Sequence, residues 1–252
     1  MPPCLSFAPL LLWPLPADAS AHGPAVDRQL ILNLALALAL LTLAHGLLLG
    51  GLLLRRRATT GSVWRLEYLP LAALTVLFAG LAIRSEQLWA RTHTTGADPA
   101  AMQVEVTGMQ FAWYFRYPGP DATFGRTRPE LVAPAEANPV GLDPADPHGH
   151  DDLVTAELVL PSGRPVDLRL RAQDVIHGFA VPELRLKQNA VPGQTIHIHF
   201  TPTTPGTYAI LCTQLCGTGH FRMNANLRIV APAEFNTWLA TRQAAARQET
   251  TP

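Results

Sequence analysis

Two long apolar runs in the first third of this 252-residue chain constrain its fold more than any other feature. The first extends from Leu30 to Leu54, and its only polar side chains are Asn33, Thr42 and His45. As a helix rising about 1.5 Å per residue it spans roughly 37 Å, enough to cross a bilayer with some tilt. The second run, Leu66 to Ile83, is shorter but adequate. The pair predicts a transmembrane hairpin within residues 28–91.

Basic residues between the two runs predict the orientation of the hairpin. Arg55, Arg56, Arg57 and Arg65 crowd the short connection, and short loops rich in arginine stay in the cytoplasm. Both ends of the hairpin, and everything after it, are then expected on the outer side. We therefore predict a multi-pass membrane protein whose C-terminal domain lies on the positive side of an energy-transducing or plasma membrane, which in a bacterial cell is the periplasmic face of the inner membrane.

Residues 1–22 have the look of a targeting segment. An apolar core from Leu5 to Leu15 precedes Ala19-Ser20-Ala21, which fits the small-x-small pattern of a leader-peptidase site. The segment lacks an Arg or Lys before the core, and proline interrupts the core. The pattern predicts a cleaved signal peptide, with a retained N-terminal tail as the alternative.

After Thr92 the composition changes to short alternating segments separated by turns rich in proline and glycine, which is typical of an antiparallel barrel or sandwich. The expected strands are 102–107, 110–117, 155–160, 166–171, 195–200, 208–211 and 226–230. A terminal helix is expected over 234–247, packed through Phe235, Trp238 and Leu239. The net charge of zero provides no basic surplus for binding nucleic acid.

A long insertion, residues 118–152, separates two of these strands and is rich in proline, aspartate and glycine. Its histidines, His148 and His150, stand beside Asp151 and Asp152 and could bind a metal. Without a rigid frame or a further ligand, the better prediction is a solvated loop.

The stretch from Cys212 to Met223 gathers two thiols, an imidazole and a thioether in one glycine-containing loop. A disulfide would leave His220 and Met223 without a role. A zinc site with His177 and His220 would leave Met223 unexplained, because a thioether is a poor zinc ligand. A single copper would leave one of the two thiolates unexplained. Two coppers bridged by both thiolates, each with one histidine, use every group. His177 is the best candidate for the second histidine, since His197 and His199, two residues apart in a predicted strand, face the same way and look like part of an exposed strand face.

The pattern Cys-x-x-x-Cys-Gly-x-x-His-x-x-Met, with Asp-Val-x-His-x-Phe-Ala-Val-Pro upstream, resembles the binuclear copper (CuA) domain of the cytochrome c oxidase subunit II family. The resemblance extends to the helical hairpin and to 108–117, 184–187, 190–193 and 205–208. It implies a cupredoxin-like Greek-key β-barrel over 92–232 on two transmembrane helices, followed by a C-terminal helix and tail over 233–252. The ligands it implies are His177, Cys212, Gln214 through its carbonyl, Cys216, His220 and Met223.

The same resemblance implies a function in electron transfer. The chain would accept electrons from cytochrome c and pass them to haem in a catalytic subunit of a respiratory oxidase. That complex would reduce oxygen to water and pump protons. No Cys-x-x-Cys-His sequence is present for covalent haem. The alternatives are the CuA subunit of a nitric oxide reductase and, in another class, a membrane-tethered copper carrier or assembly protein.

Three positions depart from the family pattern or carry a weaker prediction. Gln214 stands where many relatives have a glutamate that helps to bind magnesium or manganese, so that second metal is not expected. Phe111 stands where relatives have the tryptophan at which electrons enter; Trp113 lies two residues on, and either ring could instead be a core aromatic. Glu67 falls where the family often has a glutamate at a proton-uptake path, or is an ordinary acid at a helix N-terminus.

Overall fold

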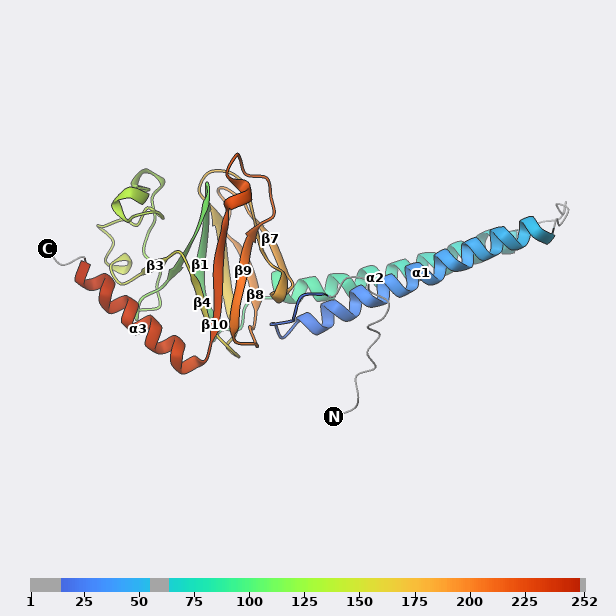
Figure 1. The fold of residues 1–252 in the computed structure, drawn as a ribbon, viewed down its shortest axis with the longest axis horizontal. Helices are drawn as coiled ribbons and strands as arrows, with labels where there is room; N and C mark the ends of the chain where they lie inside the picture. Colours follow the sequence, from blue (N-terminus) through green and yellow to red (C-terminus); the bar gives the residue numbers. More distant parts are fainter. Residues whose placement is uncertain (1–14, 55–63, 250–252) are drawn as a thin grey trace.

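Two long helices form a hairpin that extends from one side of a β domain (Figure 1). The computed structural model describes residues 15–54 and 64–249. Helix α1 is Gly23–Leu54 and α2 is Trp64–His93, so both run beyond the apolar cores that predict them. Arg55 to Arg57 and most of the apolar core before Pro16 lie outside the described residues.

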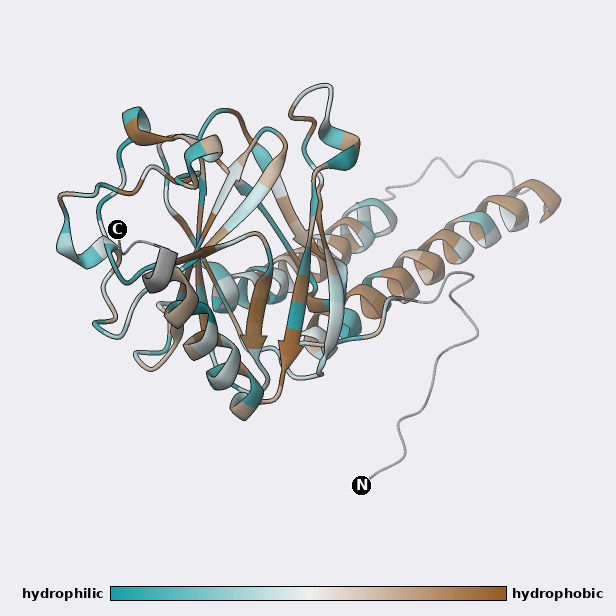
Figure 2. Cartoon of the chain, turned by 60° about the vertical axis from the view of Figure 1, so that its left-hand side comes forward, coloured by the Kyte–Doolittle hydropathy of each residue, from teal (hydrophilic) through white to brown (hydrophobic). Residues whose placement is uncertain are grey.

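Apolar residues occupy most of the hairpin (Figure 2), and its large apolar side chains are exposed. Both helices are long and apolar enough to cross a membrane, and their most apolar windows are not buried against the rest of the chain. Leucine and alanine favour the helix, and a helix that is apolar all round needs a lipid or protein surrounding. The hairpin is therefore a membrane anchor. Toward the end of the hairpin that is next to the β domain, the Arg84 Nε donates to Gln29 Oε1 at 2.6 Å and ties the two helices together.

The β domain consists of two five-stranded sheets that enclose one core. In order, the first sheet contains β3 (Leu153–Thr155), β2 (Ala112–Tyr117), β1 (Met102–Met109), β5 (Val166–Ala172) and β8 (Ile196–Phe200). The second contains β4 (Leu158–Pro161), β10 (Asn224–Val230), β9 (Gly206–Cys212), β6 (His177–Val181) and β7 (Leu186–Ala190). Fully buried side chains from both sheets, such as Phe115 and Phe179, meet between the layers.

Consecutive strands repeatedly change sheets, as in a Greek-key barrel. The predicted two-helix, all-β architecture with a terminal helix is confirmed. One detail differs, because β1 pairs with β5 and β4 pairs with β10 in parallel, whereas the sequence predicts an antiparallel arrangement throughout. Parallel neighbours require a long crossover, and several strands do lie between the members of each pair.

Strands β6 (residues 177–181) and β7 (residues 186–190) are absent from the sequence prediction, which places no strand between residues 171 and 195. All five residues of β6 are buried, so the alternation that marks a half-exposed strand is missing. The predicted strand 155–160 is in fact two short strands, β3 and β4, which belong to different sheets. These differences matter because β6 begins with His177.

The 118–152 insertion folds against the first sheet and contains three short 3-10 helices, η2 (Pro129–Leu131), η3 (Pro134–Glu136) and η4 (Pro147–Gly149). The buried Arg116 holds both ends of it: its guanidinium contacts Glu105 at 2.8 Å and Asp152 at 3.0 Å, and donates to the Gly125 carbonyl at 2.7 Å. Opposite charges that are buried together offset part of the cost of removing each from water. The insertion is thus an ordered part of the domain.

The C-terminal helix α3 (Pro232–Glu249) lies on the side of the β domain away from the hairpin (Figure 1). Phe235 is buried, and Trp238 and Leu239 pack against the core, as predicted. Trp238 meets Tyr117 edge to face, with ring centroids 5.3 Å apart.

Candidate metal centre

The candidate ligands meet at one edge of the second sheet, where three strands begin or end. Strand β9 ends at Cys212, β6 begins at His177, and β10 follows Met223. Antiparallel pairing places Phe179 opposite Cys212, and the Cys212 amide donates to the Met223 carbonyl at 3.1 Å. The loop between β9 and β10, which includes η6 (His220–Arg222), is therefore closed at its base by backbone hydrogen bonds.

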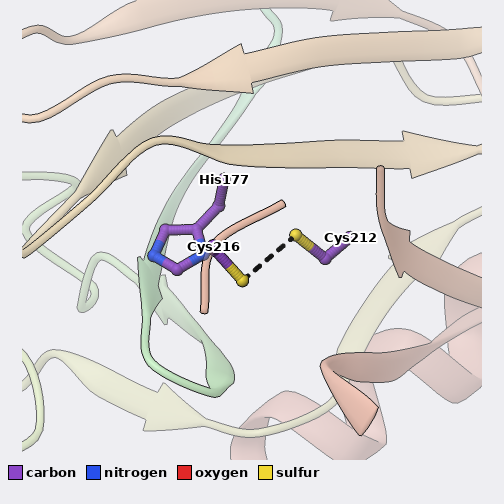
Figure 3. A group of neighbouring side chains, drawn as sticks. All are labelled: His177, Cys212 and Cys216. Atoms are coloured by element: carbon purple, nitrogen blue, oxygen red, sulfur yellow. Dashed lines mark hydrogen bonds between the residues drawn. The ribbon is translucent and has the colours of Figure 1, made fainter. Parts of the chain in front are cut away.

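Two free thiols form the middle of the centre (Figure 3). The Cys212 and Cys216 sulfurs lie 3.8 Å apart, well beyond the roughly 2.05 Å of a disulfide. The Cys216 sulfur is 3.6 Å from His220 Nδ1 and 3.7 Å from the Met223 sulfur. The Gln214 carbonyl oxygen lies 3.2 Å from the Cys212 sulfur.

The imidazole of His177 completes this cluster. One ring nitrogen of His177 and the two thiol sulfurs all lie within 4.8 Å of one another. Within residues 15–54 and 64–249, no other set of three or more His, Cys, Asp or Glu side chains is so close. The structure thus brings together the six residues that the sequence predicts as ligands.

His177 also provides a test of whether a metal fits here. Its side chain is fully buried, and Nε2 donates to Asp174 Oδ1 at 2.8 Å, while Nδ1 is buried without a hydrogen-bond partner. A buried polar atom without a partner is costly unless something absent from the protein atoms binds it. Metal-binding imidazoles typically have one nitrogen on the metal and the other on a carboxylate. The site therefore fits a metal, and its soft donors fit copper.

Asp174 holds His177 in this orientation. Burial opposes the charge on Asp174, but hydrogen bonds from the amides of Gln110 and Val175 and from His177 hold its pKa below the usual value. The group is therefore a carboxylate at neutral pH. Asp174 opens the Asp-Val-x-His motif, and its position three residues before a candidate ligand is the sequence signal that could have predicted this role.

The Cys216 thiol of the metal-free site is expected to stay protonated at neutral pH. Burial, with the neighbouring Cys212 thiol, raises the pKa of Cys216 to about 11. Metal ions bind the thiolate, so binding must displace a proton from Cys216. Cys216 and Met223 are 5% and 2% exposed, which keeps water away from these two sulfurs, whereas Cys212 is half-buried.

Two glycines let the ring of Phe111 close over the loop. A Cβ added at Gly219 would lie 2.3 Å from that ring, and Gly217 has a φ of 134°, which disfavours other residues. Beside them, the Gln110 side-chain amide donates to the Cys216 carbonyl. Phe111 and Gln110 therefore support the loop from the first sheet.

The three weaker predictions have different surroundings. Trp113 is 1% exposed and meets His177 edge to face, with ring centroids 5.8 Å apart, so it lies in the core beneath the site. Phe111 is half-buried at the surface of the loop. Glu67 is exposed in the first turn of α2, at the end of the hairpin far from the metal centre (Figure 1).

The remaining histidines do not join the site. His197 and His199 were predicted on an exposed face, but their rings contact the buried Asp167 carboxylate at 2.9 and 3.1 Å, and His199 is only 14% exposed. In the insertion, His148 contacts Asp121 at 2.6 Å on the exposed surface. That pair agrees with a solvated loop.

The part of the chain that contains this centre matches the model of a known protein family. The family model described as "Cytochrome C oxidase subunit II, periplasmic domain" matches residues 102–230, from β1 to the end of β10. The chain belongs to the cytochrome c oxidase subunit II family. The match contains every candidate ligand and the whole 118–152 insertion. Its name calls this domain periplasmic, in agreement with a domain anchored by membrane helices.

Named subunit II proteins show the same relationship. The chain is 40% identical over 154 residues to the alternative cytochrome c oxidase subunit 2 of Bradyrhizobium diazoefficiens, covering 60% of this chain and 54% of that one. It is 32% identical over 145 residues to cytochrome c oxidase subunit 2 of a Synechocystis species, covering 58% and 34%. The chain thus spans about half or less of these relatives. The crystal structure of the periplasmic domain of subunit II from Bradyrhizobium japonicum matches with 25% identity and a TM-score of 0.44, covering 60% and 99%.

Proposed function

We propose that this chain is the electron-accepting subunit of a haem-copper respiratory oxidase and that its metal centre is a binuclear copper site. The observation that carries the proposal is the unpartnered Nδ1 of His177 beside two free thiols. The family supports copper, because its name is that of a cytochrome c oxidase subunit.

Each candidate ligand has a distinct task in such a site. Cys212 and Cys216 would hold the copper through their sulfurs, and His177 and His220 would hold it through their imidazole nitrogens. Met223 and the Gln214 carbonyl would complete the set. The copper pair, when bound, supplies uptake and release of one electron at a time. The chain keeps these donors in a frame fixed by three strands, so that they move little when the charge of the site changes.

The partners follow from the same proposal. Cytochrome c would deliver electrons at the outer surface of the loop, near Phe111, and the haem-bearing catalytic subunit would receive them. The hairpin would hold the domain on the periplasmic face of the bacterial inner membrane, against that subunit and its neighbours. Oxygen reduction and proton pumping would occur in the partner. Gln214 offers a neutral side chain, so a magnesium or manganese site at this position is not part of the proposal.

Electron uptake can be tested on the isolated chain. The full chain in detergent, loaded with copper, would be mixed with reduced cytochrome c in a stopped-flow instrument. We expect oxidation of one cytochrome per chain. The metal-free chain and the copper-treated Cys216→Ser variant should leave the cytochrome reduced. A fully loaded chain that does not oxidise cytochrome c would contradict the proposed function.

The reaction of the complex needs a separate test, because the catalytic residues lie in another subunit. The complex purified through this chain would be given reduced cytochrome c with either oxygen or nitric oxide. We expect oxygen to be consumed. Consumption of nitric oxide alone would assign the chain to a nitric oxide reductase.

A further inference from the structure

The residues just before helix α1 lie along the β domain (Figure 1). The Ala19 amide donates to the Glu183 carbonyl at 2.9 Å, and the Ala19 carbonyl accepts from the Thr203 amide at 2.8 Å. The Ala21 amide donates to the Thr201 carbonyl at 3.0 Å, and a β-bridge joins Ser20 to Pro202. This segment, Pro16–Ala21, is called the clasp below.

Side chains of the clasp are part of the folded domain. Ala19 is fully buried and belongs to the hydrophobic core, and Ser20 is 3% exposed. Arg185 reaches the clasp and α1 together: its guanidinium donates to the Pro16 carbonyl at 2.8 Å and pairs with Asp27 at 2.8 Å. The clasp therefore joins the β domain to the first turns of the hairpin.

The clasp also caps helix α1. The Ser20 hydroxyl accepts from the Gly23 amide at 3.0 Å, at the first residue of the helix, and the Ser20 amide donates to Asp18 at 3.0 Å. Serine and aspartate are suited to this place because the first amides of a helix lack partners and attract negative charge.

Cleavage at the predicted leader-peptidase site would undo these contacts. Hydrolysis of the bond after Ala21 adds water across it and leaves a carboxylate on Ala21 and an ammonium on His22. The clasp would leave with the leader, and the Thr201 carbonyl and Thr203 amide would lose their partners. The new positive charge at His22 would lie at the N-terminus of α1, where the helix dipole disfavours it.

We infer that the clasp is retained in the mature protein and that any leader-peptidase cut lies before Pro16. Ala19-Ser20-Ala21 is then part of the folded structure, and it matches the small-x-small pattern of a cleavage site only because its residues are small. This inference does not depend on the metal or on the proposed electron transfer.

The direct test is the N-terminus of the mature protein. The full chain would be produced in the membrane of a bacterial host, purified, and examined by intact mass and N-terminal sequencing. We expect the chain to begin at Pro16 or earlier. A chain that begins at Ala17 or later, and at His22 in particular, would overturn the inference.

An exposed residue of the motif permits a matched variant. Ala21 has an exposed side chain, so Ala21→Gln removes the small residue that a peptidase needs before the cut and leaves the buried contacts in place. The mature N-terminus of this variant should be unchanged, with a mass difference equal to the substitution alone. Accumulation of a longer precursor would show that the wild-type cut follows Ala21.

Hydrogen exchange tests the contacts themselves. A chain made to begin at His22, behind a leader with its own cleavage site, should exchange the Thr203 amide at least tenfold faster than the full-length chain. The Ser162 amide, which donates to Val230 without help from the clasp, serves as the internal control. Equal rates at Thr203 in both chains would refute the clasp.

Discussion

The two ring nitrogens of His177 have different tasks. Nε2 donates to Asp174, which is itself held by the Gln110 and Val175 amides, and Nδ1 remains free beside the sulfurs. A carboxylate on the far side of a metal-binding imidazole fixes its tautomer and orientation. Asp174 is therefore a positioning residue for the proposed copper ligand.

Replacing Asp174 with asparagine should weaken copper binding without removing a ligand. Loss of such a partner typically costs about 10- to 100-fold in metal affinity, and we expect an effect of that size. Competition with a chelator of known affinity would measure it. Asp121→Asn, which breaks the exposed His148 pair, is the matched control and should bind copper as the wild type does. Equal affinities in both variants would remove Asp174 from the account.

Gly219 should not tolerate even one added carbon. Its Cβ would overlap the Phe111 ring near the point where that ring joins its own chain, so the ring cannot swing away cheaply. We expect Gly219→Ala to lower the free energy of unfolding by about 1–3 kcal/mol, as overpacking does, and to reduce copper retention. Gly96→Ala, with open space around it, is the control for thermal unfolding. A Gly219→Ala chain as stable as the control would contradict the close packing of this loop.

At the scale of elements, the sequence predicts most of the hairpin and the strands that alternate. It cannot predict β6, because a strand buried on both faces has no alternation, and β6 carries His177. The candidate ligands could be predicted because two thiols, an imidazole and a thioether are rarely found so close together in a sequence. The contacts by which Gln110 and Phe111 support the loop could not be predicted, since Gln110 and Cys216 are 106 residues apart and only the fold brings them together.

Asp152, at the end of the insertion, leads to a prediction about how the stability of the domain depends on pH. Burial raises its pKa to about 6, against the opposing hydrogen bonds from Gly125 and Arg116. Between about pH 4 and pH 6 the folded chain therefore holds a proton that the unfolded chain, with a pKa of 3.8 at this group, has lost. The contribution of this group to stability is full below pH 4 and falls as the pH rises through 6.

Asp152→Asn should remove that dependence. From pH 4 to pH 7, the free energy of unfolding of the wild type minus that of the variant should fall, by at most about 3 kcal/mol. Urea unfolding of the copper-free chain at several pH values would measure the difference. A difference that stays constant or rises with pH would contradict the assignment.

At the scale of the whole molecule, exposed apolar surface appears in two places. One is the hairpin. The other is a rim around the metal loop: within the described residues outside the hairpin, the exposed large apolar side chains are Val175, Ile176, Leu211, Leu215 and Phe221. Each lies within two residues of a candidate ligand in the sequence. Apolar surface concentrated at the loop that is proposed to carry electrons is suited to contact with a redox partner.

Polar substitutions on this rim should weaken the donor complex. In the assembled oxidase, Leu215→Gln with Phe221→Gln should raise the KM for cytochrome c at least tenfold, because tenfold corresponds to about 1.4 kcal/mol and burial of even one such side chain is worth about 1.5–3 kcal/mol. The copper spectrum should not change. Ala244→Gln, on the exposed surface of α3, is the control. An unchanged KM would exclude the rim from donor contact, and loss of the catalytic subunit during purification would assign the rim to that subunit.

The central claim is that Cys212, Cys216, His177 and His220 hold two coppers as one unit. The most direct test is the electron paramagnetic resonance spectrum of the full chain loaded with copper, recorded beside a metal count. The account predicts two coppers per chain and one unpaired electron shared equally between them, and it predicts that Cys216→Ser abolishes this signal. One copper per chain, or a four-line spectrum from a single localised copper, would contradict it.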